Sequence, residues 1–89
     1  MPTDPEQLEF FSDRVLLRRV DAERNMRRFY LMTVQRDLFG GTTLMREWGR
    51  IGCAGKVRIS HHYDEGRAVD ALAETARIKQ RRGYRSDKA

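Results

Sequence analysis

The stretch over residues 42–52 constrains this chain most, because it holds the only tryptophan and no signal that starts or stops a helix. Its sequence, TTLMREWGRIG, alternates well enough to predict a β-strand. Side chains two positions apart on a strand share a face and lie about 7 Å apart. We therefore expect Arg46 and Arg50 to flank Trp48 on one face. Gly49, on the opposite side, would leave a notch where another backbone or a helix can come close.

Two interpretations of Trp48 follow from this stretch. Tryptophan is highly buried on average, which favours a core residue with the two arginines as solvated edges. In the other interpretation the ring and the arginines form a recognition surface, because guanidinium groups match phosphates and aromatic faces stack on bases or sugars. The stretch taken alone favours the first.

Length and composition limit the number of domains, the class of partner and the cell compartment. A chain of 89 residues forms one domain with a single two-layer core. Its net charge of +5 is compatible with a polyanionic partner. One cysteine excludes an internal disulfide and suits a reducing cytoplasm. The start is polar and acidic, unlike a secretory signal, and no apolar run is long enough to cross a membrane. We expect a cytoplasmic protein without a membrane partner.

Four segments are predicted to be strands. The second of them is nearly continuous in strand-forming apolar residues from Phe29 to Val34, which is typical of a central strand covered on both faces. The connections are short and polar or rich in glycine, and so predict an antiparallel meander. The predicted strands span residues 14–20, 27–36, 42–51 and 56–60.

A helix is predicted over residues 65–82. Asp64 suits the N-cap, and Gly83 suits the position where the helix stops. A narrow, alanine-rich stripe at helical spacing would let the helix lie close to the sheet. The predicted fold is therefore α+β, a small antiparallel sheet of about four strands with one C-terminal helix packed on it. The pattern leaves open which face of the sheet the helix covers.

The chain divides into a domain over residues 14–84 and two flanking segments. Residues 1–13 are interpreted as an N-terminal tail or docking segment, because residues 8–11 form a short apolar patch. Residues 85–89 are interpreted as a C-terminal tail that frays.

No catalytic pattern is recognisable. His61 and His62 are adjacent, so on a strand they point to opposite faces, and together with Cys53 they lack the paired spacing of a zinc site. No glycine loop ends in the Lys-Ser/Thr pair that cradles phosphates. We therefore expect no enzyme activity, no catalytic residues, no metal, no cofactor and no small-molecule substrate.

Basic residues occur in clusters that run the length of the chain. Each cluster alone is explained by a solvated face, but the preference for arginine and the interleaved aromatic residues favour phosphate contacts. The clusters comprise Arg14, Arg18 and Arg19; Arg24, Arg27 and Arg28; Arg46 and Arg50; Lys56 and Arg58; and Arg77, Lys79, Arg81, Arg82, Arg85 and Lys88.

The segment REWGRIG, residues 46–52, resembles the signature of the WGR domain. The resemblance extends to NMRRFY at residues 25–30, followed by Gln35, to GKVRI at residues 55–59, and to KQRRGY at residues 79–84. It covers nearly the whole chain, from residue 15 to residue 84. The family has a small antiparallel sheet with one helix packed on it, in agreement with the pattern above.

The resemblance also implies a function. In DNA-dependent poly(ADP-ribose) polymerases the WGR domain grips DNA near a break, and its tryptophan packs against a sugar at the end of a strand. Carried over, Trp48 would stack on a terminal nucleotide, Arg50 would contact the DNA backbone or a partner, and Gly49 would permit the close approach. Arg46 and Lys56 are added because they lie near the motif in sequence.

This chain carries no polymerase domain, regulatory helical domain or zinc fingers, and so resembles the short stand-alone WGR proteins of bacteria. Two hypotheses follow. The first is a non-catalytic nucleic-acid-binding module for DNA ends or nicks, without base readout. The alternative is a protein-interaction or homo-oligomerisation module that uses the apolar patch at residues 8–11 or an exposed sheet edge.

Overall fold

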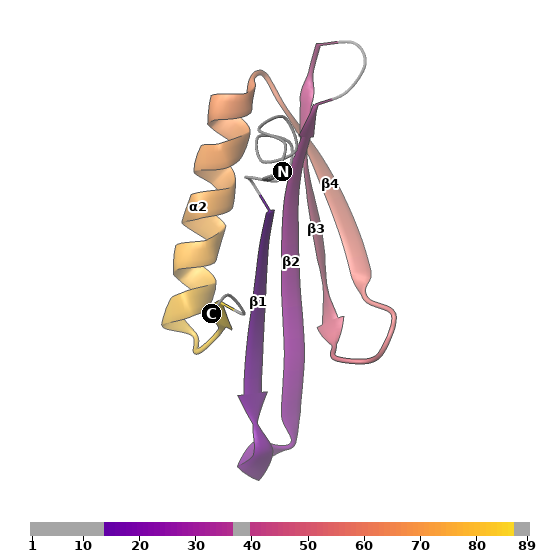
Figure 1. Ribbon diagram of the computed structural model, residues 1–89, viewed down its shortest axis with the longest axis vertical. Coiled ribbons are helices and arrows are strands. Elements are labelled where there is room, and N and C mark those ends of the chain that lie inside the picture. The colour runs from indigo at the N-terminus through magenta and orange to yellow at the C-terminus, as the bar shows by residue number, and fades with distance from the viewer. Residues whose placement is uncertain (1–13, 37–39, 87–89) are drawn as a thin grey trace, which may run out of the picture.

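The computed structural model describes residues 14–36 and 40–86, which form a five-stranded antiparallel sheet with one α-helix packed on it (Figure 1). The strands lie in the order β4-β3-β2-β1-β5. This arrangement confirms the predicted α+β class. The elements are β1 (Arg14–Asp21), the short 3-10 helix η1 (Ala22–Arg24), β2 (Met26–Arg36), β3 (Thr42–Arg50), β4 (Lys56–His62), α2 (Glu65–Arg81) and β5 (Arg85–Ser86).

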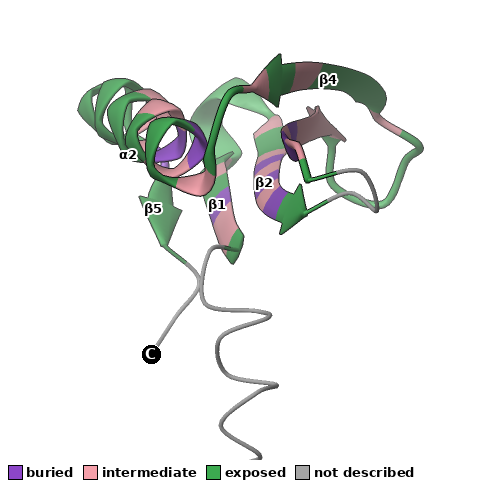
Figure 2. Ribbon diagram, turned by 90° about the horizontal axis from the view of Figure 1, so that it is seen from above, coloured by how far each residue is buried: buried purple, intermediate pink, exposed green. Residues whose placement is uncertain are grey.

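The pairing register shows which face of the sheet α2 covers. Tyr30 on β2 lies directly across from Leu17 on β1 and from Trp48 on β3, so these three side chains share a face. That face is the buried one, because Leu17 is fully buried and packs in one cluster with Leu72 of α2. The core residues are Leu17, Tyr30, Met32, Val34, Leu44, Ala68, Leu72 and Tyr84, and Figure 2 shows buried positions on α2, β1 and β2. Trp48 therefore lies on the helix-covered face.

The opposite side of the sheet carries apolar residues as well. The prediction that the second strand is covered on both faces does not hold within the described residues: Met32 is fully buried, whereas Phe29 and Leu31 are half-buried. Among residues 14–36 and 40–86 there is one α-helix, and it packs on the other side. We call this second side the open face; its large apolar residues are Leu16, Val20, Phe29, Leu31, Met45, Val57 and Ile59.

The helix follows the predicted signals. The Oδ1 atom of Asp64 accepts a hydrogen bond from the backbone N–H of Arg67 at 2.9 Å, as expected of an N-cap. The helix ends at Arg81, and Gly83 adopts φ +102°, the left-handed conformation that stops a helix. Ala68 and Leu72 are buried along the predicted stripe. None of the helices in the described residues is both long and apolar enough to cross a membrane.

The C-terminal end differs from the sequence prediction. Arg85 and Ser86 do not fray but pair with Arg18 and Leu17, and so add β5 beside β1. The reason is Tyr84, which is buried in the core and brings the following residues against β1. The predicted tail or docking segment at residues 1–13 lies outside the described residues, as do residues 37–39 and 87–89.

Candidate nucleic-acid interface

The candidate site is centred on Trp48, near the end of β3. Its ring stacks on the ring of Tyr30, with centroids 5.7 Å apart and an angle of 18° between the planes. The ring of Tyr84 meets Tyr30 edge-on, with centroids 6.4 Å apart. Tyr30 is buried, whereas Trp48 is only half-buried. The core thus fixes Trp48 through Tyr30 and leaves part of the indole accessible.

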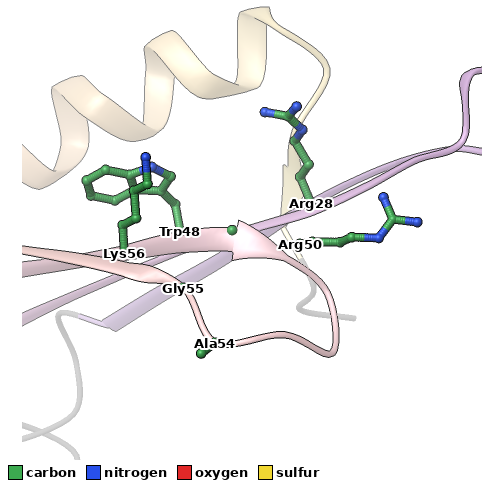
Figure 3. Close-up of a pocket in the computed structure, with 7 residues that line it drawn as sticks. Arg28, Trp48, Arg50, Ala54, Gly55 and Lys56 are labelled. Carbon is green, nitrogen blue, oxygen red and sulfur yellow. The ribbon is translucent and has the colours of Figure 1, made fainter.

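A cavity of about 350 Å³ opens beside Trp48. Figure 3 shows Lys56 rising alongside the indole and Arg28 on the other side of it, while Arg50 points away. Three neighbouring strands, β2, β3 and β4, and the turn between β3 and β4 supply the wall. The lining residues are Arg28, Trp48, Gly49, Arg50, Ala54, Gly55 and Lys56.

Two glycines allow the turn before β4 to lie tightly against β3. A Cβ atom on Gly55 would come within 2.5 Å of the Trp48 carbonyl oxygen and 2.9 Å of Cζ of Phe29. A Cβ atom on Gly49 would lie 3.0 Å from Cα of Gly55. The notch predicted at Gly49 is therefore present and is filled by the backbone of the turn. This close approach places Lys56, which follows the turn, directly across from Trp48.

Three arginines form a row across the sheet at this end. Arg28 lies directly across from Arg19 on β1 and from Arg50 on β3. Neighbouring strands lie about 4.8 Å apart, and like charges directly opposite each other are destabilising. Among the described residues none of the three has a carboxylate within 4.0 Å. Such a row is typical of a surface that meets anions.

Hydrogen bonds hold Arg50 against the connection between β1 and β2. Its Nη1 atom donates to the backbone oxygen of Asn25 and its Nη2 atom to Oδ1 of the same residue, each at 3.4 Å. Asn25 adopts a left-handed backbone conformation, with φ 53°. The carried-over role of Arg50 as a contact to DNA or to a partner is untested, and within the domain Arg50 braces this connection.

Lys79, near the end of α2, brings a further cation to the stacked rings. Its Nζ atom lies 4.6 Å from the ring centroid of Tyr30 and 5.6 Å from that of Tyr84. Burial lowers the pKa of Lys79, and the nearby charges of Arg82 and Arg28 lower that pKa further. Lys79 therefore lies against the buried ring on which Trp48 stacks.

Four of the five predicted site residues line one cavity: Trp48, Gly49, Arg50 and Lys56. The fifth, Arg46, is not among the lining residues. Its Nη2 atom donates to Oγ of Ser60 at 3.4 Å, and its buried Nε atom has no partner among the described residues. Arg46 shares a face with Trp48 as expected, but its side chain is committed to the contact with β4.

Sequence reasoning missed Arg28, Ala54 and Gly55 as part of the site. The signal for Arg28 lies in the strand pairing: once Tyr30 is placed opposite Trp48, Arg28 falls opposite Arg50. Gly55 has no comparable signal, because its role depends on how tightly the turn packs. As for metals, the part of the chain that the structure describes brings together no three His, Cys, Asp or Glu side chains as potential ligands.

The fold and the cavity define a small α+β module that presents an aromatic ring among cations at one end of its sheet. The model of the WGR domain family matches residues 13–89, and the chain belongs to this family. It is also 42% identical over 72 residues to the uncharacterized protein y4dW of Sinorhizobium fredii, a match that covers 81% of this chain and 35% of that protein. The chain thus spans about a third of that relative's length. No solved structure matches.

Proposed function

We propose that the cavity beside Trp48 binds DNA at ends or nicks, through phosphate contacts and stacking, without catalysis and without base readout. The observation that carries the proposal is the half-buried indole of Trp48, set in a cavity whose cations Arg28, Arg50 and Lys56 have no carboxylate partner among the described residues. The WGR family is associated with nucleic-acid binding, which supports the proposal.

The size of the cavity favours the end of a strand over the middle of a duplex. A volume of about 350 Å³ is at the lower end for ligand pockets, which hold about 300–1,000 Å³. A sugar or base within an intact duplex is already stacked on its neighbours, whereas a terminal nucleotide presents a free face to Trp48. Stacking of an aromatic side chain on a base tolerates any sequence, because every base has a π-face.

The chemistry of the lining favours backbone contacts. Arginine and lysine neutralise phosphates, and these contacts position a protein on DNA without reading sequence. The lining residues include no Asn, Gln, Asp or Glu, the side chains that read adenine and cytosine edges. The stacked pair of Trp48 and Tyr30 is already ordered by the core, so little entropy is lost when a nucleotide binds.

The test compares a covalently closed DNA dumbbell, which has no ends, with the same dumbbell carrying one nick. Fluorescence anisotropy would measure binding of the unaltered protein and of Trp48→Ala. We expect tighter binding to the nicked dumbbell and a loss of that preference in Trp48→Ala, by about 1–3 kcal/mol as for other stacked bases.

The matched control is Tyr63→Ala. This change removes an aromatic ring that is 81% exposed and contacts Arg67, outside the cavity. Tyr63→Ala should keep the preference for the nick, and circular dichroism should show that both variants are folded. Equal binding to both dumbbells, unchanged in Trp48→Ala, would reduce the site to a non-specific basic surface.

A further inference from the structure

The open face is a largely apolar surface on the side of the sheet away from α2, and Glu47 lies in it between Leu31 and Val57. Leu31 lies directly across from Leu16 on β1, and Met45 lies directly across from Ile59 on β4. Val57 and Ile59 share this face and are 54% and 55% exposed. Within residues 14–36 and 40–86 no helix or strand lies over it. Contiguous exposed apolar patches mark interaction sites on soluble proteins.

The chain's own residues 1–13 have the composition that matches this surface. Leu8, Phe10 and Phe11 supply three large apolar side chains, and the segment contains no lysine or arginine. On β1, Arg14 and Arg18 lie on the open face, one on each side of Leu16, and form a basic border to it. The segment is acidic and so complements this basic border; its carboxylates are Asp4, Glu6, Glu9 and Asp13.

Chain geometry lets the segment reach across the sheet. Residues 1–13 join β1 at Arg14, which lies in the same row of paired residues as Met45 and Ile59. The distance from β1 to β4 is three strand spacings, or about 14 Å. An extended chain covers about 3.3 Å per residue, so the stretch from Leu8 to Arg14 spans about 20 Å. By the same measure Phe10 lies about 13 Å from Arg14. Leu8 and Phe10 are two positions apart, so they share one side of the extended segment and are both within reach of the apolar row.

A second copy of the chain fits the same face less well. Stable interfaces between proteins use about 20–30 residues a side, whereas the open face offers seven large apolar residues. A covalently attached segment has an effective concentration in the millimolar range, which favours it over a dilute partner.

We propose that Leu8 and Phe10 of residues 1–13 pack on the open face of the same chain. The segment is then the second cover of the sheet, as α2 is the first, and residues 1–13 belong to the folded domain. Because the open face lies on the side of the sheet away from Trp48, this cover leaves the cavity accessible. The proposal does not depend on the proposed function, since it involves no residue of the cavity wall.

The test uses the full chain and nuclear magnetic resonance with methyl groups labelled. Aromatic rings shift the resonances of methyl groups packed against them, so we expect nuclear Overhauser contacts from Phe10 to the methyls of Val57 and Ile59. Phe10→Ser combined with Phe11→Ser should abolish these contacts and move both resonances. The buried methyls of Leu44, on the helix side, should remain in place and so show that the variant is folded.

Two results would overturn the proposal. In a sample that mixes labelled with unlabelled chains, contacts seen only between chains would assign the open face to a second copy. The segment does not pack on the open face if the methyl resonances of Val57 and Ile59 stay in place in the double variant and show no contact to the phenylalanines. Pro5→Ala, a change outside the apolar patch, serves as the matched control and should leave all three sets of methyls unchanged.

Discussion

The indole of Trp48 lies against the phenol ring of Tyr30, with centroids 5.7 Å apart and planes inclined by 18°, and this contact joins the core to the cavity. Tyr30 is buried among residues of the sheet and of α2, whereas Trp48 lines the cavity. The orientation of the exposed ring is therefore set by the packing of the buried one.

Replacing the buried ring should release the exposed one. In Tyr30→Leu the stacked pair is lost, and such pairs are worth about 0.5–1.5 kcal/mol beyond the apolar area that they bury. We expect the free energy of unfolding to fall by about 1–3 kcal/mol, as measured by urea titration. The fluorescence emission maximum of Trp48, the single tryptophan, should also shift to longer wavelength as the indole becomes more exposed to water. Tyr63→Leu, at an exposed ring, should leave both measurements nearly unchanged.

Two glycine substitutions should distinguish a loss of stability through backbone strain from damage to the cavity beside Trp48. Gly52 has φ +90° with open space around it, so Gly52→Ala costs about 1–2 kcal/mol of stability through backbone strain. Gly55→Ala places its methyl against the Trp48 carbonyl and the ring of Phe29, and the turn must shift. We expect both variants to lose stability but only Gly55→Ala to lose DNA binding as well. The same drop in affinity for both would contradict this account of the turn.

Arg28 should make one phosphate contact. Each neutralised phosphate adds about 0.9 to the steepness of log affinity against log salt concentration, so Arg28→Ala should reduce that slope by about one. Arg77→Ala removes the same charge from the exposed side of α2, where Arg77 pairs with Glu74. Its slope should match that of the unaltered protein. Anisotropy titrations at several salt concentrations measure both slopes, and equal slopes in the two variants would exclude Arg28 from the contact.

Lys79 should make stability depend on alkaline pH. Its pKa in the folded state is lowered, mainly by burial, from the ordinary value of 10.5. Between the lowered pKa and 10.5 the unfolded chain holds more protons than the folded one, so the free energy of unfolding rises as the pH increases through this window. Lys79→Met should lack this rise. Urea titrations of both proteins at neutral pH and near pH 10 give the comparison, and parallel profiles would show that Lys79 does not contribute.

Much of the fold could be predicted because its signals are local. The alternation around Trp48, the cap at Asp64 and the stop at Gly83 each depend on residues close in sequence, and the structure confirms all three. The cluster of cations around the cavity could not be predicted from such local signals. Arg28 joins the site only through the pairing of β2 with β3, which depends on register rather than on the residues around Arg28.

Two other features lay beyond local reasoning. A two-residue strand such as β5 has no periodicity to detect, and it forms because Tyr84 is drawn into the core. The side chain of Arg46 was expected beside Trp48, but its direction is decided by Ser60, which the strand pairing brings near it. In both cases a contact between distant segments decides the outcome.

Lys56 has a second role, because it lies on the free edge of β4. Among the strands of residues 14–36 and 40–86, β4 pairs with β3 alone, so its other side offers backbone groups on which further strands can add and protein can aggregate. Charged side chains such as Lys56 and Arg58 on that edge oppose such growth by repulsion between molecules. A phosphate bound at Lys56 would neutralise part of this repulsion. Occupancy of the site and the solubility of the protein are therefore coupled through one side chain, and Lys56→Glu, which keeps a charge on the edge, separates the two better than Lys56→Ala.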